Sequence, residues 1–301
     1  MRIIVPIKQV PETNAVKMDE ATGTMIREGV EAIINPLDLY AIEAAIQLRE
    51  AAAPGSVEVV ALSMGPPKAA VALKEAIAMG IDSAVLVSDK AFAGSDTWAT
   101  SYVLASAIRR LRKEGTAAGD PGATGTGTAA NSAAVAPQSV APAAVAHDLI
   151  LCGERATDGD TGQVGPGIAS FLGLPVVSYV SKIESVSGGK ARVHRLVEDG
   201  HEVLDVDLPA VFTVVKEVAS PRLPTLSGKL KAKKVQVPTW GPKDLDVEAG
   251  HLGLEGSPTR VVKIFRPKVA RECQKVLALD EKAVAAAVDQ LVEFLRKKEL
   301  V

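Results

Sequence analysis

The segment Leu149–Pro166, LILCGERATDGDTGQVGP, passes from an apolar strand through a glycine-rich acidic loop into a helix. The strand, expected over Asp148–Cys152, lacks alternation of polar and apolar residues, which is typical of a strand covered on both faces. Gly159 and Gly162 allow the backbone of the loop to approach a ligand closely. This unit predicts a parallel sheet with a binding site where the loop leaves the strand.

Further strands and helices alternate along the chain. Apolar runs rich in β-branched residues predict strands at Arg2–Ile7, Val57–Leu62, Ala84–Val87 and Ala210–Val215. The expected helices are Pro36–Ala51, Pro67–Met79, Asp96–Lys113 and Thr161–Leu172. The alternation predicts an α/β fold, with an open, mostly parallel, twisted sheet flanked by helices, of the Rossmann-like kind.

The pattern changes after about residue 180. Gly188-Gly189 and Asp199-Gly200 separate short alternating runs, and glycine supplies the positive φ that hairpin turns require, so we expect an antiparallel addition to the sheet. Beyond residue 220, prolines and glycines are frequent until Asp280–Glu299, whose apolar residues mark one face of a helix. We expect a nucleotide-binding domain at 1–220 and an extended arm ending in a helix at 221–301.

Residues 115–146 form a low-complexity segment. They are mostly Gly, Ala, Ser, Thr and Pro, so they bury too little apolar area to offset the entropy lost on ordering. We expect a surface insertion here. The run Gly125–Ala130 matches a dinucleotide-binding fingerprint in composition only, because no strand precedes it.

Composition and charge restrict the class of protein. With 47% hydrophobic and 23% charged residues, the chain is typical of a globular protein, and a net charge of -2 gives no electrostatic argument for nucleic acid or an anionic membrane as the main partner. Cys152 and Cys273 lack metal-site spacing. The apolar run in Met1–Val10 is too short for a signal peptide or a membrane span. We therefore expect a cytoplasmic protein without membrane insertion.

The loop DGDTG has the features of an anion site. The amides of Thr161–Val164 would lie at a helix start, where N–H groups lack partners and the helix dipole is positive, so they suit a phosphate. In this interpretation Asp160 caps the helix, and Asp158 accepts from a ribose hydroxyl or a loop amide. Alternatively, DGDTG is only a tight turn before a capped helix, or an acidic cluster that holds a cation.

The loops after other expected strands are also candidates. Asn35 precedes Pro36, so it would cap the following helix or, with Asp38, read an adenine edge or a ribose. Met64 and Gly65 would lie against a flat ring, or Met64 would fill the core.

A third candidate loop precedes the helix expected from Asp96. Ser95 or Asp96 would cap this helix, while Phe92 and Trp98 suit packing better than ring stacking. Hydrolytic and zinc chemistry are disfavoured, because no catalytic or metal motif contains the histidines His147, His194, His201 and His251.

Four motifs together resemble the β subunit of an electron transfer flavoprotein. They are VPIKQVP (Val5–Pro11), INPLDLYAIEAA (Ile34–Ala45), ALSMGPP (Ala61–Pro67) and GERATDGDTGQVGP (Gly153–Pro166). The resemblance runs almost end to end, apart from residues 115–146. A further signature, VHRLVEDGHEVLDVDLPAVFT at Val193–Thr213, has Phe212 where the family usually has an aliphatic residue.

The resemblance implies a heterodimer with an α subunit that carries FAD, and a pocket for an adenosine phosphate in this chain. By matching motifs, the residues of the pocket are Pro6, Asn35, Pro36, Leu37, Asp38, Met64, Gly65, Arg155, Ala156, Thr157, Asp158, Gly159, Asp160, Thr161, Gly162, Gln163, Val164, Gly165 and Pro166.

Family members hold either structural AMP or a second FAD in this pocket. Three segments resemble the electron-bifurcating, FAD-holding type: Asp158–Pro166, Ser88–Ser101 and Glu255–Lys268. In that type NADH gives a hydride to the β-subunit flavin. One electron then passes to the α-subunit FAD and on to a high-potential acceptor, and the other passes to ferredoxin or flavodoxin.

The resemblance also implies residue roles beside a flavin. Arg155 would supply a positive charge that stabilises the reduced, anionic ring. Ala91–Thr97, with Phe92, Asp96 and Thr97, would flank the ring or the nicotinamide.

The segment PRLPTLSGKLKAKK, Pro221–Lys234, resembles the family's partner-recognition loop. Leu226 would be the apolar anchor for a flavin-dependent dehydrogenase, with the lysines as a charged rim. The lysine run alone would otherwise be a solvated face. The final helix would pack on the flavin domain of the α subunit. The alternatives are an electron-carrier subunit with structural AMP and a nucleotide-binding sensor module of the same architecture.

Overall fold

The computed structural model describes residues 1–12, 32–117, 149–262 and 275–301. These residues belong to two compact units, Met1–Val262 and Lys263–Val301, and each unit is described by itself. None of the helices in the described ranges is both long enough and apolar enough to cross a membrane.

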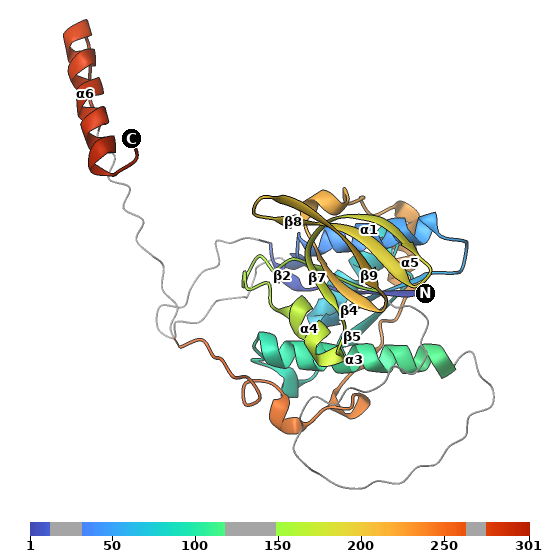
Figure 1. Cartoon of the computed structure of the whole chain (residues 1–301). Helices are drawn as coiled ribbons and strands as arrows, with labels where there is room; N and C mark the ends of the chain where they lie inside the picture. The colour runs from blue at the N-terminus through green and yellow to red at the C-terminus, as the bar shows by residue number, and fades with distance from the viewer. Residues whose placement is uncertain (13–31, 118–148, 263–274) are drawn as a thin grey trace. The chain divides into compact units, whose positions relative to one another are not determined.

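Across the described part of the first unit, nine strands form one sheet in the order β11-β5-β4-β1-β6-β10-β7-β8-β9. Figure 1 labels β4, β5, β7, β8 and β9 of this sheet. The first seven in this order are parallel, and β8 and β9 are antiparallel. Their bounds are β1 (Arg2–Pro6), β4 (Glu58–Met64), β5 (Ser83–Val87), β6 (Leu149–Gly153), β7 (Val176–Ser187), β8 (Lys190–Val197), β9 (Gly200–Asp207), β10 (Ala210–Val214) and β11 (Thr239–Trp240). The sheet confirms the predicted α/β class, including the hairpin addition.

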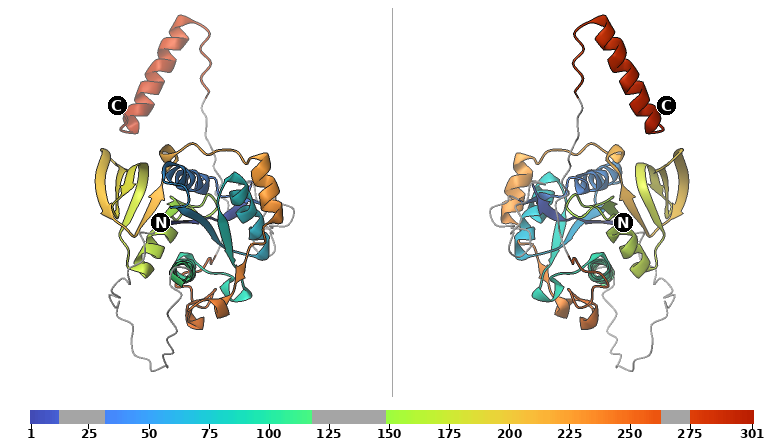
Figure 2. Two further views of the ribbon diagram at one scale, coloured as in Figure 1. Left: turned by 90° about the vertical axis from the view of Figure 1, so that its right-hand side faces the viewer. Right: turned by 90° about the vertical axis from the view of Figure 1, so that its left-hand side faces the viewer.

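Helices cover both faces of the sheet (Figure 2). Ile3 and Val5 of β1 pack in one apolar cluster with α1 (Asp38–Ala51) and α2 (Ala70–Met79). Ile4, between them, packs in a second cluster with α3 (Thr97–Ala117) and α4 (Val164–Leu172). Successive side chains of a strand point to opposite faces, so a strand covered on both sides needs apolar residues throughout. This explains the missing alternation in the sequence.

All four helices predicted between residues 36 and 172 begin later than expected: α1 by two positions, α2 by three, after a 3-10 turn at Pro67–Ala69, α3 by one and α4 by three. The helix expected from Thr161 starts at Val164, because Asp160 (φ 54°) and Gly162 (φ 64°) adopt left-handed conformations that interrupt a right-handed helix. The helix expected from Pro36 starts at Asp38. Of the predicted insertion, residues 115–117 continue α3, and the rest lies outside the described residues.

The first compact unit extends past residue 220, where we expected its end, to Val262. Residues 221–234 were expected to be a loop, but Leu226–Lys234 form helix α5. Thr225 caps α5, because its side chain accepts a hydrogen bond of 2.9 Å from the Gly228 amide. Gly228 lies so close to α2 that an added Cβ would overlap the Ala78 carbonyl oxygen. The chain then adds β11 to the sheet beside β5.

In the second unit, α6 (Glu281–Lys297) matches the predicted final helix to within two residues at each end. Asp280 caps it, since its carboxylate accepts a hydrogen bond of 2.8 Å from the Ala283 amide. Val284, Val288 and Leu291 on its apolar face are about half exposed within the described chain.

Candidate ligand-binding site

The strand order reverses direction at β1. From β1 the chain continues outward to β4 and β5, whereas the next parallel strand, β6, lies on the other side of β1. In open parallel sheets, ligands bind outside the carboxyl ends of the strands at such a point. The loops that meet there follow Pro6 of β1 and Gly153 of β6.

Asn35 ties these loops together. It follows β3 (Ala32–Ile34), which pairs with β2 (Gln9–Pro11) in a small antiparallel sheet. Its side-chain nitrogen donates to the Arg155 carbonyl and to Asp38 Oδ1, both at 2.9 Å. Its side-chain oxygen accepts from the Thr157 amide at 3.1 Å. Asn35 is 1% exposed. The helix-capping role predicted for Asn35 is therefore wrong, because its side-chain oxygen accepts a hydrogen bond from Thr157 in the β6–α4 loop and not from an amide of α1.

Gly153 permits close contact between the same loops. A Cβ at this position would overlap Asp38 Oδ1 and lie 2.9 Å from the backbone C and O of Leu37. A contact this close to backbone atoms leaves no room for any side chain. Glycine is therefore required where β6 enters its loop.

The start of α4 offers free hydrogen-bond donors. Gln163 occupies the N-cap position in a right-handed helical conformation, without a side-chain cap. In the described part of the chain, the amides of Thr161, Gly162, Gln163 and Val164 donate no hydrogen bond. Unpaired amides at a helix start bind anions. Unpaired donors are therefore present, but Thr161 and Gly162 lie in the loop before α4 and not in its first turn, as was predicted.

The acidic residues of the loop face cations. Asp158 Oδ1 lies 2.6 Å from Lys8 Nζ, and Asp160 Oδ1 lies 3.1 Å from Arg155 Nε. The capping role predicted for Asp160 is wrong, because this residue is left-handed and lies four positions before α4. Among the described residues, no cluster of three or more His, Cys, Asp or Glu is arranged to hold a metal ion. Because Lys8 and Arg155 are paired with these carboxylates, the amides of Thr161–Val164 are the principal groups that could bind an anion here.

Lys8 is a site residue that sequence reasoning missed. Lys8 lies two positions after the end of β1, at the end of the sheet where β6 also ends. Its partner Asp158 is 150 residues away in the sequence. The sequence feature that could have indicated Lys8 as a site residue is its place in a loop that follows an expected strand.

Arg155 is half exposed and also lies 3.4 Å from Glu154 Oε1.

The β5–α3 loop joins the site through Thr97 and Asp96. Thr97 Oγ1 donates to Gln163 Oε1 at 2.8 Å. Asp96 caps α3, as predicted, by accepting from the Ala99 amide at 3.0 Å. Its other oxygen accepts from the amide and hydroxyl of Thr259 at 2.9 and 2.8 Å. Partial burial alone would raise the pKa of Asp96, but these hydrogen bonds hold it below its ordinary value.

The remaining predicted residues differ in accessibility. Met64 and Gly65 end β4 and are partly exposed beside β1, whereas Pro6 is buried. Phe92 is buried in the core cluster that includes Val87 and Leu104, so its ring packs in the core rather than beside a ligand. The pocket residues with accessible surface at this edge include Pro36, Leu37, Ala156, Gly159 and Pro166, whereas Gly165 is buried in the first turn of α4. Leu226 lies on α5, which packs on α2 away from the crevice.

Asp38 is a buried carboxylic acid beside the crevice. The Lys8 amide donates to its Oδ2 at 2.7 Å, and Asn35 donates to its Oδ1. Burial raises the pKa of Asp38 to about 7, and the hydrogen bonds from Lys8 and Asn35 only partly oppose this shift. The neighbouring Cys152 thiol is also buried, and burial raises its pKa.

The pKa of Asp38 predicts a pH-dependent stability. Between 3.8 and about 7 the native carboxyl keeps a proton that the unfolded chain releases, so stability falls as pH rises through this window and is constant above it. The loss is on the order of 4 kcal/mol, at about 1.4 kcal/mol per pKa unit. Urea unfolding of wild type and Asp38→Asn from pH 4 to 8 measures it. The wild type should lose stability relative to the variant as pH rises, and parallel curves would contradict the assignment.

The reversed strand order and the free amides at α4 define an open, doubly wound α/β protein with its candidate site at the switch point. The electron transfer flavoprotein domain matches the chain at residues 22–138 and 123–245. The chain belongs to the electron transfer flavoprotein family and resembles its β subunits over its full length.

Three relatives illustrate the similarity. Caffeyl-CoA reductase-Etf complex subunit CarD of Acetobacterium woodii is 40% identical over 301 residues, covering 100% of both chains. Electron transfer flavoprotein subunit beta of Megasphaera elsdenii is also 40% identical over 301 residues, with 100% of both chains covered. Protein FixA of Azorhizobium caulinodans is 38% identical over 291 residues, which is 96% of this chain and 92% of that protein.

Proposed function

We propose that this chain is the β subunit of a heterodimeric electron transfer flavoprotein that binds FAD at the crevice between β1 and β6. In this proposal the subunit accepts a hydride from NADH. One electron passes to the α-subunit FAD and a flavin-dependent dehydrogenase, and the other passes to ferredoxin or flavodoxin. The name of the similar CarD subunit, from a caffeyl-CoA reductase-Etf complex, supports a dehydrogenase-type partner.

The observation that carries the proposal is the row of unpaired amides at Thr161–Val164. A diphosphate needs several donors that approach without side chains in between, and peptide N–H groups at a helix start meet this need. Nothing lies within 4 Å of a Cβ built on Gly159, so the loop has room for a ligand beside it. Asp158 and Asp160 are paired with Lys8 and Arg155, which reduces their repulsion of a phosphate.

In the proposal each neighbouring group has a defined task. Asn35 fixes the β6–α4 loop through its bonds to Arg155 and Thr157, so the amides are held in place before the ligand arrives. Met64 and Gly65, partly exposed at the end of β4, would contact the adenosine. Arg155 would place positive charge near the ring, although its guanidinium is shared with Glu154 and Asp160.

FAD is favoured over AMP by the surroundings of the phosphate loop. Thr97 donates a hydrogen bond to Gln163, so the β5–α3 loop borders the site, and Thr259 donates to Asp96 of that loop. AMP would need only the phosphate loop and the residues that contact its adenosine. The flavin ring of FAD and the nicotinamide of NADH need additional protein segments beside them. AMP, which carries one phosphate for the same amides, is the second candidate.

A bound flavin would supply redox chemistry that protein side chains lack, namely hydride acceptance from NADH and release of electrons one at a time. The chain's contribution is to bind the phosphates, to orient the ring and to set the charge around it. The apolar face of α6 would pack on the α subunit, and the exposed Leu226 would contact the dehydrogenase.

Nucleotide extraction from the purified heterodimer tests the proposal. We expect FAD in excess of the α-subunit flavin, no AMP, and bleaching of both flavins when NADH is added anaerobically. AMP in place of the second FAD would support the alternative subunit type. A heterodimer containing neither nucleotide in this subunit, after incubation with both, would contradict the proposal.

A further inference from the structure

We propose that Arg222 is a positioning residue that fixes the apolar segment Leu223–Leu230 for docking of the dehydrogenase. The inference rests on the docking surface proposed above. It concerns how this surface is held rather than whether it exists.

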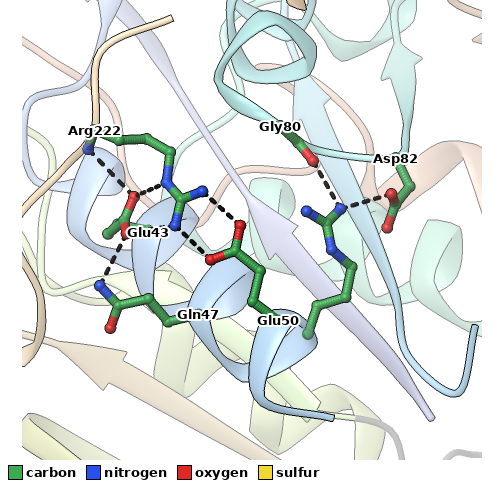
Figure 3. A network of polar contacts seen from close by, with 7 residues as sticks. Glu43, Gln47, Glu50, Gly80, Asp82 and Arg222 are labelled. Atoms are coloured by element: carbon green, nitrogen blue, oxygen red, sulfur yellow. Dashed lines mark hydrogen bonds and ion pairs between the residues drawn. The ribbon is translucent and has the colours of Figure 1, made fainter. Parts of the chain in front are cut away.

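Arg222 joins the segment to α1 through two carboxylates (Figure 3). Its Nε and Nη2 donate to the two oxygens of Glu43 at 2.8 and 2.9 Å. Its Nη1 and Nη2 donate to the two oxygens of Glu50 at 2.6 and 2.9 Å. The Arg222 amide also donates to Glu43 Oε2 at 3.2 Å. Both pairings use two parallel donors, which fixes the orientation of the guanidinium.

Glu43 makes this contact more than a surface ion pair. Its side chain is 4% exposed, so its charge requires partners inside the protein. Gln47 donates to one oxygen at 2.8 Å, and Arg222 supplies the remaining hydrogen bonds. Burial alone would raise the pKa of Glu43, but the hydrogen bonds from Arg222 and Gln47 hold it below its ordinary value. A buried carboxylate therefore holds the chain at Arg222.

The segment that follows is exposed and apolar. Leu223, Leu226 and Leu230 are 86%, 76% and 54% exposed. Leu226 and Leu230 are four positions apart on α5, so they lie on one face of the helix. The segment is attached at its start by Arg222 and again at Gly228, which packs against Ala78 of α2.

Attachment at these two points has a consequence for binding. A docking segment that is already ordered loses less conformational entropy when the partner binds. Removing the Arg222 anchor should therefore weaken docking without any loss of contact between the leucines and the partner. The effect of Arg222 should also depend on Leu226, because Arg222 acts by positioning that side chain.

A double-mutant cycle in the full heterodimer tests this inference. The variants are Arg222→Gln, Leu226→Ala and the pair together, with caffeyl-CoA reductase as the probe partner. We expect Leu226→Ala to raise the Kd for the probe by about thirtyfold and Arg222→Gln by about fivefold. The increase in Kd of the double variant should be well below the product of the two single increases. Amide hydrogen exchange at Leu223–Leu230 should accelerate in Arg222→Gln and stay unchanged in Leu226→Ala.

Arg49→Gln is the matched control. Arg49 lies on α1, as Glu43 and Glu50 do, and donates hydrogen bonds to Asp82 Oδ1 and the Gly80 carbonyl at 2.6 and 2.7 Å, but no hydrogen bond or ion pair among the described residues joins it to Leu223–Leu230. This variant should leave both the Kd and the exchange rates of the segment unchanged. If Arg222→Gln fails to fold, Arg222→Lys replaces it, since lysine keeps the charge and loses the paired geometry.

The outcomes separate the two proposals. If Leu226→Ala weakens docking but Arg222→Gln changes neither the Kd nor the exchange rates, the positioning role is wrong and the docking surface stands. If Arg222→Gln and Leu226→Ala act independently, Arg222 has a general structural role and the inference fails. If Leu226→Ala leaves the Kd unchanged, the docking surface itself is wrong and the inference falls with it.

Discussion

Gly153→Ala is expected to weaken nucleotide binding at least tenfold, which corresponds to about 1.4 kcal/mol of binding free energy. The added Cβ would overlap Asp38 Oδ1 and press on the Leu37 backbone. The Leu37 atoms are backbone, and the buried Asp38 carboxyl is held in place by hydrogen bonds from the Lys8 amide and Asn35, so the β6–α4 loop must move away from the β3–α1 loop. This movement shifts the amides of Thr161–Val164 out of position. Calorimetric titration of FAD and AMP into the nucleotide-depleted heterodimer measures the change.

Gly250→Ala is the control for this prediction. Gly250 lies in the short 3-10 turn Ala249–His251, outside the candidate site, a Cβ there has nothing within 4 Å, and its φ is not in the left-handed region. The variant should bind nucleotide with nearly the wild-type Kd. Equal affinities for Gly153→Ala and wild type would show that the close approach of the two loops does not shape the site.

Asn35→Ala is expected to lower the free energy of unfolding by about 2–3 kcal/mol and to weaken nucleotide binding about tenfold. Asn35 is almost fully buried and bonds Asp38, Arg155 and Thr157. Each buried polar group left without a partner costs about 1–3 kcal/mol, and water near the exposed Thr157 recovers part of this cost. Loss of the bond to the Thr157 amide also frees the loop that carries the phosphate donors.

Urea unfolding and the same titrations test this second prediction. Gln9→Ala serves as the control, because Gln9 is a nearby amide whose exposed bond to the Lys68 carbonyl is 3.3 Å long. It should change neither stability nor binding. A large loss of stability in Asn35→Ala without loss of affinity would limit Asn35 to a role in the fold.

Most of the fold was predictable from local pattern. The unbroken apolar run at Ile3, Ile4 and Val5 predicts a strand covered on both faces, and the two helix-lined clusters confirm it. Helix α5 was not predictable in this way, because Ala232 is its only buried residue and its apolar period is weak. Strand β11 has two residues, Thr239 and Trp240, and depends on pairing with β5 far earlier in the chain.

The site was predictable where it depends on neighbouring residues. The unpaired amides near Thr161 follow from a glycine-rich loop before a helix, and they are present. The partners of the side chains were not predictable. Asn35 bonds residues about 120 positions away, and Lys8 pairs with Asp158, 150 positions away. The capping role of Asp160 failed because its left-handed conformation is set by the whole loop.

The central claim is that the amides of Thr161–Val164 hold the phosphates of an adenine nucleotide. The most direct test is a crystal structure of the heterodimer prepared with saturating FAD, and a second with AMP. The account predicts phosphate oxygens within hydrogen-bond distance of these amides, in the crevice between β1 and β6. A structure in which this corner is empty or filled by side chains, despite saturating nucleotide, would contradict it.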